Sequence, residues 1–325
     1  MMKAFQFSNV STGLEFKDVR IPTPGKGQVL VQVKATGLCH TDCNVISGKD
    51  DMLFWQRPIT LGHEIAGTIL TLGPDVAEFS VGERVVSGLG IDHPLTFQDV
   101  TTSPGIGYDG GYAEYAVFNV SKTLRIPDGV TFAQAAVATD AIATAYHAVV
   151  VEGRVSSLST VAIVGLGGLG LSAVSLARLM GAKVYGIDID PKKYVVALQA
   201  GAVTCAKSLD KFSGIRFDVV VDFAGAGVTT AAAVKAVKPG GRIILVGLAA
   251  KEATLSTYDF VAQGAHLIGS AGSSVEEVRE VLELIAEGKI DPIIEEIPFA
   301  DIPKGLDRLT NGGALGRLYA DPSKA

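Results

Sequence analysis

A glycine-rich turn between an apolar run and a helical stretch is the feature that most restricts the fold of this chain. The segment Gly165–Gly170 reads GLGGLG, follows the uncharged run Val161–Val164 and precedes the helical stretch Leu171–Met180. Between a strand and a helix, such glycines leave room for a pyrophosphate, and the unpaired N–H groups of the helix N-terminus attract anions. The segment therefore predicts a dinucleotide-binding α/β domain. A turn that binds nothing is the alternative interpretation.

The positions of this turn have distinct expected tasks. Gly165 permits the tight turn, Gly167 lets the pyrophosphate approach the backbone, and Gly170 lets the helix pack closely against the strand. We expect Gly168 and Leu169, which lie between them, to belong to the same cofactor site.

An acidic residue ends the next apolar run. Val184–Ile187 predicts a strand, and Asp188 follows it at roughly the 20-residue distance typical of dinucleotide-binding folds. A carboxylate there accepts hydrogen bonds from the adenosine ribose hydroxyls and repels a 2′-phosphate. Asp188 therefore favours NAD over NADP, with a solvated strand end as the alternative.

The rest of the chain falls into regions of different pattern. Val29–Lys34 and Tyr112–Val117 alternate apolar and polar residues, which predicts a β-rich region before residue 132. Between residues 160 and 269, apolar runs alternate with helical stretches, which predicts a parallel sheet covered on both faces. Ser274–Ala286 has the apolar period of a helix. At 325 residues, the chain is long enough for two domains.

Composition excludes several classes of protein. Hydrophobic residues make up 48% and charged residues 19%, unlike a disordered chain, and a net charge of −6 gives no sign of a nucleic-acid or acidic-membrane partner. Val161–Ala177 is uncharged, but its glycines favour strand, turn and helix over a membrane span. Three cysteines are too few for a disulfide scaffold, and the N-terminus has no apolar leader. We therefore expect a cytoplasmic protein with reduced thiols.

Three residues far apart in the sequence have the chemistry of a metal site. Cys39 lies in the segment GLCHTD, His63 in GHE and Asp140 in an alanine-rich stretch. One thiolate, one imidazole and one carboxylate, with an open fourth position, suit a catalytic Zn²⁺. Their spacing alone does not predict a site, so a buried cysteine, a structural histidine and a helix cap are the alternative interpretations.

Several motifs occur in the order found in one protein family. They are GLCHTD (37–42), GHE (62–64), GERV (82–85), GGYAEY (110–115), the glycine turn with Asp188, KPGG (238–241) and the tail Gly316–Arg317. With them, the chain resembles the zinc-dependent, medium-chain alcohol dehydrogenase family over nearly its whole length. The resemblance implies a GroES-like, β-rich catalytic domain over residues 1–143 and 273–325. It also implies a Rossmann domain, a doubly wound parallel sheet, over residues 144–272.

The resemblance implies a ligand set as well. It assigns the catalytic zinc to Cys39, His63 and a third residue, which is cysteine in many members and aspartate in some microbial secondary-alcohol dehydrogenases. Asp140 resembles the aspartate type, and a carboxylate with a thiolate still neutralises Zn²⁺. Glu64 resembles a residue that approaches the metal when water leaves, so we expect a transient ligand. Many members hold a second, structural zinc, which we do not expect here because residues 87–109 contain no cysteine.

Proton transfer and cofactor contacts follow from the same resemblance. Thr41 matches the hydroxyl residue that passes the alcohol proton toward the cofactor ribose. The histidine that often ends this relay is replaced by Asn44, which cannot act as a base at neutral pH, so the proton would leave through water or His40. Cofactor contacts are expected from His40, Lys193, Val246 and Arg317, with exposed charges as the alternative for Lys193 and Arg317.

The substrate and the assembly are less constrained. Leu53, Trp55 and Leu89 are expected to line an apolar pocket, with core packing as the alternative. The resemblance implies hydride transfer between NAD(H) and an alcohol, ketone or aldehyde, and we favour a hydrophobic or secondary alcohol. Two other functions stay open, a zinc-free NAD(P)H-dependent quinone or enoyl reductase of the same superfamily and a non-catalytic NAD-binding protein. The resemblance also implies a homodimer or homotetramer joined through the edge of the Rossmann sheet, to which Ala253–Gly269 would belong.

Overall fold

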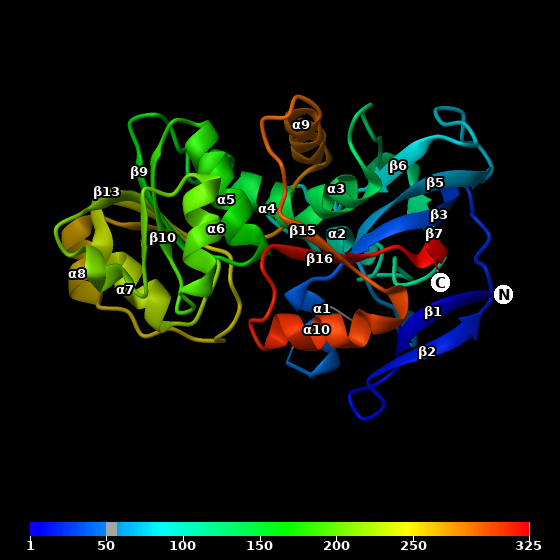
Figure 1. Cartoon of the computed structure of the whole chain (residues 1–325), viewed down its shortest axis with the longest axis horizontal. Helices are drawn as coiled ribbons and strands as arrows, with labels where there is room; N and C mark the ends of the chain where they lie inside the picture. The colour runs from blue at the N-terminus through cyan, green and yellow to red at the C-terminus, as the bar shows by residue number, and fades with distance from the viewer. Residues whose placement is uncertain (50–56, 325) are drawn as a thin grey trace. The chain divides into compact units, whose positions relative to one another are not determined.

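The structure, a computed structural model, describes residues 1–49 and 57–324. The chain divides into two compact units, Met1–Ala143 with Gly272–Ala325 and, between them in sequence, Thr144–Ala271 (Figure 1). The first unit is therefore built from both ends of the chain. Leu53 and Trp55, expected in the substrate pocket, lie outside the described residues.

The described part of the first unit contains two sheets. The larger joins, in spatial order, β15 (Ile294–Ile297), β16 (Arg317–Ala320), β3 (Gln28–Gly37), β5 (Glu64–Leu72), β6 (Arg84–Ser87) and β8 (Thr123–Arg125), with β7 (Tyr115–Asn119) paired to β3. The smaller joins β2 (Leu14–Val19), β1 (Met2–Phe7) and β4 (Ile59–Thr60). The β-rich region is confirmed. The strand predicted from Tyr112 begins only at Tyr115, because the Tyr112 backbone bonds instead to Leu61 and Phe5.

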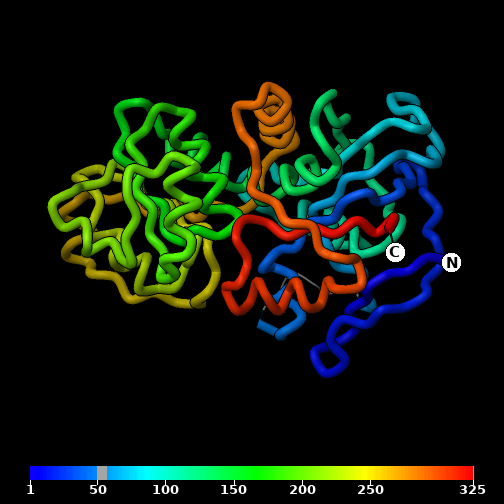
Figure 2. Tube along the Cα trace, viewed as in Figure 1, coloured from blue at the N-terminus to red at the C-terminus, as the bar shows by residue number. Residues whose placement is uncertain are grey.

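The helices of the first unit include α1 (His40–Ile46), α2 (Phe97–Thr101), α3 (Phe132–Val137), α9 (Val275–Ala286) and α10 (Ile302–Thr310). Helices α1 and α10 lie side by side (Figures 1 and 2) and bury Val45 and Leu306 in a core that includes Leu38. Because Leu38 directly precedes Cys39, this core fixes the start of α1. The helix predicted over Ser274–Ala286 is confirmed as α9, whose first turn is held by a capping box between Ser274 and Glu277.

The second unit is a parallel sheet between helices. Its described strands follow the order β11 (Thr204–Ala206), β10 (Lys183–Ile187), β9 (Thr160–Val164), β12 (Phe217–Asp222), β13 (Val237–Leu245) and β14 (His266–Gly269). Helices α5 (Gly168–Leu179) and α6 (Lys192–Ala200) cover one face, and α7 (Val228–Ala236) and α8 (Thr257–Gln263) cover the other (Figure 1). Helix α4 (Ala143–Tyr146) lies where the chain passes from the first unit to the second. The predicted doubly wound parallel sheet is confirmed.

The strand order reverses next to β9. Strand β9 pairs with β10 on one side and with β12 on the other, so the chain winds outward in both directions from this point. In open parallel sheets, ligands bind beyond the carboxyl ends of the strands at such a reversal. The glycine turn Gly165–Gly170 directly follows β9 and therefore lies at that position. None of the described helices is long and apolar enough to cross a membrane.

Candidate functional site

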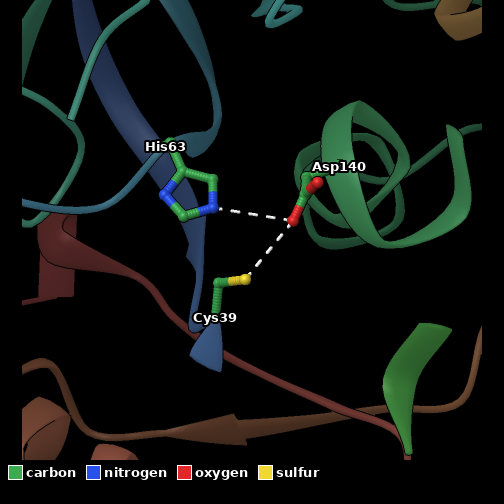
Figure 3. A group of neighbouring side chains, drawn as sticks. All are labelled: Cys39, His63 and Asp140. Carbon is green, nitrogen blue, oxygen red and sulfur yellow. Dashed lines mark hydrogen bonds and ion pairs between the residues drawn. The ribbon is translucent and has the colours of Figure 1, made fainter. Parts of the chain in front are cut away.

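Three side chains from distant parts of the sequence meet in the first unit (Figure 3). The Sγ of Cys39 lies 3.4 Å from Asp140 Oδ2, and the Nε2 of His63 lies 3.5 Å from the same oxygen. One ligand atom from each residue lies within 4.8 Å of the others, and all three residues are buried. A thiolate, an imidazole and a carboxylate at this separation fit a divalent metal such as Zn²⁺. Asp140 lies inside the helical turn Ala138–Ile142, not at a helix cap.

Strand register explains why Cys39 and His63 become neighbours. Strands β3 and β5 pair antiparallel, with Gly37 opposite Glu64. Cys39 lies just beyond Gly37, where β3 ends, and His63 lies just before Glu64, where β5 begins. Both residues therefore lie at the same end of this strand pair. A Cβ on Gly37 would lie 1.8 Å from Glu64 Oε2, so glycine at this position makes room for the Glu64 carboxylate.

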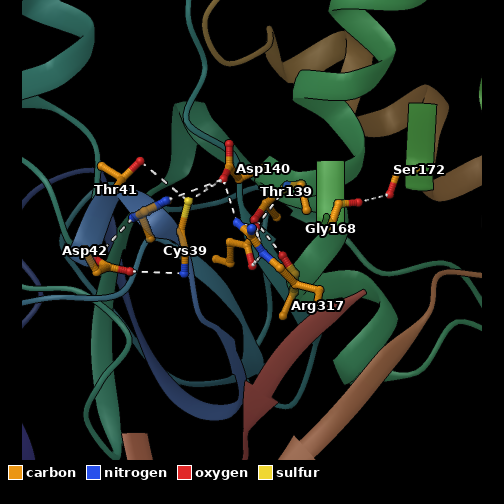
Figure 4. Close-up of polar contacts among 12 residues, drawn as sticks. Cys39, Thr41, Asp42, Thr139, Asp140, Gly168, Ser172 and Arg317 are labelled. Atoms are coloured by element: carbon orange, nitrogen blue, oxygen red, sulfur yellow. Dashed lines mark hydrogen bonds and ion pairs between the residues drawn. The ribbon is translucent and has the colours of Figure 1, made fainter. Parts of the chain in front are cut away.

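A buried arginine lies between two carboxylates of this site (Figure 4). The Nη2 of Arg317 donates to Asp140 Oδ2 at 3.0 Å and to Glu64 Oε1 at 2.7 Å. Glu64 also accepts a hydrogen bond from the Ala141 N–H at 2.9 Å, which ties the helical turn that carries Asp140 to strand β5. Burial raises the pKa of Glu64, and Arg317 opposes that rise. The expected pyrophosphate contact of Arg317 stays a prediction, and its guanidinium here binds carboxylates.

The two ring nitrogens of His63 face two different carboxylates. Nε2 faces Asp140, whereas Nδ1 lies 3.7 Å from Oδ1 of the buried Asp42. Burial alone would lower the pKa of His63, but Asp42, Cys39 and the hydrogen bond to Asp140 outweigh it and hold the pKa well above its usual value. A carboxylate behind a histidine fixes the ring and its tautomer while the other nitrogen binds a metal.

Sequence reasoning missed the roles of Asp42 and of the Arg317–Asp140 contact. The one local signal for Asp42 was its place in the first turn of α1, where its Oδ2 accepts the Cys39 N–H at 3.4 Å (Figure 4). The contact between Arg317 and Asp140 joins residues far apart in the chain and leaves no local pattern.

The other residues expected around the metal lie as follows. The hydroxyl of Thr41 lies 3.5 Å from Cys39 Sγ, so it borders the candidate ligands. His40 is exposed at the start of α1, with Nε2 3.0 Å from the carbonyl oxygen of Leu309. Asn44 is half-buried in the same helix, and Leu89 is buried. His93 is exposed.

The glycine turn of the second unit has the backbone that a dinucleotide requires. Gly165 has a φ of +88°, a left-handed conformation that favours glycine. A Cβ on Gly170 would lie 1.8 Å from the Gly165 carbonyl oxygen, whereas a Cβ on Gly167 would meet nothing within 4 Å. The open space beside Gly167, at the start of the long helix α5, suits a pyrophosphate. Gly168 and Leu169 form the first turn of that helix.

Asp188 connects the glycine turn to the strand beside it. Its Oδ2 accepts a hydrogen bond from the Leu166 N–H at 2.7 Å and lies 3.2 Å from Lys193 Nζ. Val246, another expected cofactor contact, directly follows β13 and is half-buried. The turn, Asp188 and Val246 thus all follow the carboxyl ends of strands of one parallel sheet, which is where such sheets bind dinucleotides.

Two family models match the chain. One describes an alcohol dehydrogenase GroES-like domain and matches residues 25–128, and the other describes a zinc-binding dehydrogenase and matches residues 168–287. An alcohol dehydrogenase of Geobacillus stearothermophilus is 34% identical to this chain, with 98% of each chain covered. An NAD-dependent alcohol dehydrogenase of Sulfurisphaera tokodaii is 29% identical, covering 99% of this chain and 100% of the relative.

Solved structures show the same similarity. The acetophenone reductase of Geotrichum candidum, solved in complex with NAD, has a TM-score of 0.90 and 31% identity, covering 98% of this chain and 97% of that one. The alcohol dehydrogenase of the archaeon Aeropyrum pernix has a TM-score of 0.89 and 27% identity, covering 98% of this chain and 100% of that one.

Proposed function

Because the chain belongs to the zinc-dependent alcohol dehydrogenase family, with its GroES-like and zinc-binding dehydrogenase domains, we propose that it is an NAD-dependent alcohol dehydrogenase that also reduces carbonyl compounds. The observation that carries the proposal is the convergence of Cys39, His63 and Asp140, whose ligand atoms lie within 4.8 Å of one another. Zinc held by these residues would supply a Lewis acid that polarises the substrate oxygen.

Residues of the first unit would orient the proposed metal ligands and transfer the substrate proton. Arg317 holds the Asp140 carboxylate in place and neutralises Glu64. The net charge around the metal would then be set mainly by the proposed ligands. The Thr41 hydroxyl, next to Cys39 Sγ, would relay the proton that an alcohol substrate loses, accepting it while giving its own proton to water or His40. Glu64, held by Arg317 at rest, would approach the metal only transiently.

Residues of the second unit would bind NAD. Gly165, Gly167 and Gly170 would admit the pyrophosphate, and Asp188 would accept hydrogen bonds from the adenosine ribose. Contacts from Lys193 and Val246 would complete this part of the proposal, and the contact expected from His40, a residue of the first unit, stays a prediction. The same carboxylate of Asp188 would exclude the 2′-phosphate of NADP by charge repulsion.

We propose a hydrophobic or secondary alcohol, or the matching ketone, as the substrate. The buried Leu89 and the similarity to an acetophenone reductase support this class. We further propose one catalytic zinc per chain, without a structural zinc, and a homodimer or homotetramer. Cys39, Cys43 and Cys205 are free thiols, which supports a reducing compartment such as the cytoplasm.

The experiment compares two cysteine variants of the full chain. C39S removes a proposed ligand, whereas C43S changes the thiol one helical turn further along α1, whose Sγ lies 3.5 Å from the Leu306 carbonyl oxygen. Zinc content is measured by mass spectrometry, and turnover of 1-phenylethanol with NAD is followed by NADH absorbance. We expect about one zinc per chain in wild type and C43S. For C39S we expect loss of zinc and a fall in kcat/KM of at least about a hundredfold, since a Lewis acid contributes several kcal/mol.

Other outcomes would overturn the proposal. Activity without metal on a quinone or an activated alkene would indicate a zinc-free reductase instead. If no alcohol, ketone or aldehyde changes NADH absorbance, the chain is not an alcohol dehydrogenase.

A further inference from the structure

The two carboxylate oxygens of Asp42 face different partners. Oδ2 accepts a hydrogen bond from the Tyr112 hydroxyl at 2.7 Å and from the Cys39 N–H at 3.4 Å. Oδ1 lies 3.7 Å from His63 Nδ1 and has no hydrogen-bond partner among the described residues. Asp42 is fully buried, so bulk solvent does not contact this carboxylate.

Tyr112 is fixed to the segment that carries His63. Its N–H donates to the Leu61 carbonyl at 2.9 Å, and the N–H of Gly111 donates to the Gly62 carbonyl at 2.7 Å. Its ring packs against Gly62 so closely that a Cβ there would lie 2.4 Å from the ring. Tyr112 is itself fully buried, so its hydroxyl has a defined position relative to the His63 backbone.

The orientation of Asp42 matters because of what His63 must do. A histidine that binds a metal through Nε2 carries its proton on Nδ1 and needs an acceptor there. Asp42 Oδ1 faces Nδ1 from 3.7 Å, which is longer than a hydrogen bond, so it would move closer to Nδ1 to become that acceptor. The shorter of the two hydrogen bonds that hold the opposite oxygen comes from Tyr112, and a hydroxyl that donates to a carboxylate makes one of the stronger hydrogen bonds.

We propose that Tyr112 is a positioning residue of the metal centre. Its hydroxyl anchors Asp42 so that Asp42 orients His63 for metal binding. The inference rests on the proposed function, because it takes His63 as a metal ligand, and it adds a residue that touches neither metal nor substrate. It assigns a task to the tyrosine in the GGYAEY segment, which the sequence left unexplained.

The experiment replaces Tyr112 by phenylalanine in the full chain. Y112F keeps the ring against Gly62 and removes only the hydroxyl. Zinc affinity is measured by competition with a chelator of known affinity, and the site geometry by the absorption spectrum of the Co²⁺-substituted protein. We expect zinc to bind about tenfold more weakly, because loss of a group that orients a metal ligand typically lowers metal affinity by this factor. The Co²⁺ spectrum should shift. We also expect kcat to fall, with KM for NAD unchanged.

Two further variants separate positioning from general packing. Tyr108 in the same unit also has a buried hydroxyl, and Y108F should keep wild-type zinc affinity and Co²⁺ spectrum. D42N should weaken zinc binding by itself, and Y112F should then add little to it, because Tyr112 acts through Asp42.

The outcomes distinguish this inference from the proposed function. A wild-type protein that binds neither zinc nor Co²⁺ at Cys39, His63 and Asp140 refutes both. Wild-type affinity and spectrum in Y112F, or an equal loss in the D42N background, refutes the positioning role alone. A Y112F protein that unfolds well below the wild-type temperature would assign Tyr112 a merely structural role.

Discussion

Buried charged side chains at the candidate metal site form ion pairs with one another. Arg317 is 4% exposed and Glu64 is 0% exposed, and each would be costly to bury alone. Their ion pair offsets part of that cost, and the same guanidinium also contacts Asp140, which together with Cys39 would face a metal. A thiolate and a carboxylate together match the charge of a divalent ion, so the charges of Cys39 and Asp140 support the aspartate type of ligand set that the resemblance implies.

Cofactor choice is proposed to depend on Asp188. D188N keeps an oxygen that can accept the Leu166 N–H, but it removes the charge that repels a 2′-phosphate and releases Lys193, 3.2 Å away, to bind it. One repulsion at contact distance near a protein surface amounts to about 1–4 kcal/mol. We expect the ratio of kcat/KM for NADP to that for NAD to rise at least about tenfold.

The matched control for D188N is D190N. It also replaces a carboxylate by an amide, two residues away, at a side chain that accepts a hydrogen bond from the Lys192 N–H. Its cofactor preference should equal that of wild type. If D188N still prefers NAD as strongly as wild type, the preference depends on another group.

At the scale of elements, local features were predictable and long-range ones were not. The turn Gly165–Gly170 and the helix α9 carry their signals within a few residues, because backbone conformation and capping act over one turn. The meeting of Cys39 with His63 depends on the register of β3 and β5, and Asp140 arrives on a helical turn from a third segment. For these three residues, only the family resemblance pointed to one site. Tyr112 was assigned to a strand because alternation does not reveal that its backbone pairs outside the main sheet.

Lys122 anchors the loop of residues 87–109, where we expect no structural zinc. Its buried ammonium donates to the carbonyl oxygens of Leu89 at 2.5 Å and Asp99 at 3.3 Å. K122M keeps the length of the side chain but removes the charged donor of these hydrogen bonds, while the Ser103 hydroxyl remains beside both carbonyl oxygens. Loss of hydrogen bonds from a charged group costs about 1–3 kcal/mol. We expect the free energy of unfolding in urea to fall by that amount and proteolysis within residues 87–109 to increase.

The zinc content of K122M should equal that of wild type, because the contacts of this ammonium, to Leu89, Asp99 and Ser103, include none of the proposed ligands. K289M, which changes an exposed lysine, serves as the control. Wild-type stability of K122M would show that the loop is held by other contacts.

Asp218 joins three strands at the start of the parallel sheet. Its carboxylate accepts the Thr160 N–H of β9 at 2.7 Å and, with both oxygens, the Lys238 ammonium of β13 at 2.8 Å. Burial would raise the pKa of Asp218, but the hydrogen bonds from Lys238 and Thr160 outweigh it and lower the pKa. The stabilisation is therefore present above the unfolded-state pKa of about 3.9 and is lost as the pH falls through the lower folded-state pKa.

We expect D218N to lose about 1 kcal/mol of unfolding free energy at pH 7, a modest figure because both partners are partly exposed. The difference from wild type should shrink as the pH is lowered toward about 3, as measured by urea denaturation. E252Q, at an exposed position of the same unit, is the control. A difference that stays constant with pH would rule out the charge of Asp218 as its cause.

At the scale of the whole molecule, the residues proposed to bind the metal and those proposed to bind NAD belong to separate units. Cys39, His63 and Asp140 all lie in the first unit, and the glycine turn and Asp188 lie in the second. The second unit also ends in an edge strand, β14, which pairs with β13 on one side. An unpaired edge with apolar neighbours is a template for pairing with another chain.

The neighbours of this edge lead to a prediction about assembly. Helix α8 precedes β14 and buries none of its residues, and its Tyr258 and Val261 are 81% and 77% exposed. Exposed large apolar side chains on the helix that precedes an edge strand indicate an interface, which supports the proposed homodimer or homotetramer. We expect V261E to lower the mass measured by light scattering at micromolar concentration, because a carboxylate would be buried without a partner. L158E, at a 90% exposed leucine of the same unit outside α8 and β14, should keep the wild-type mass. An oligomer that survives V261E, or that L158E disrupts equally, would place the interface elsewhere.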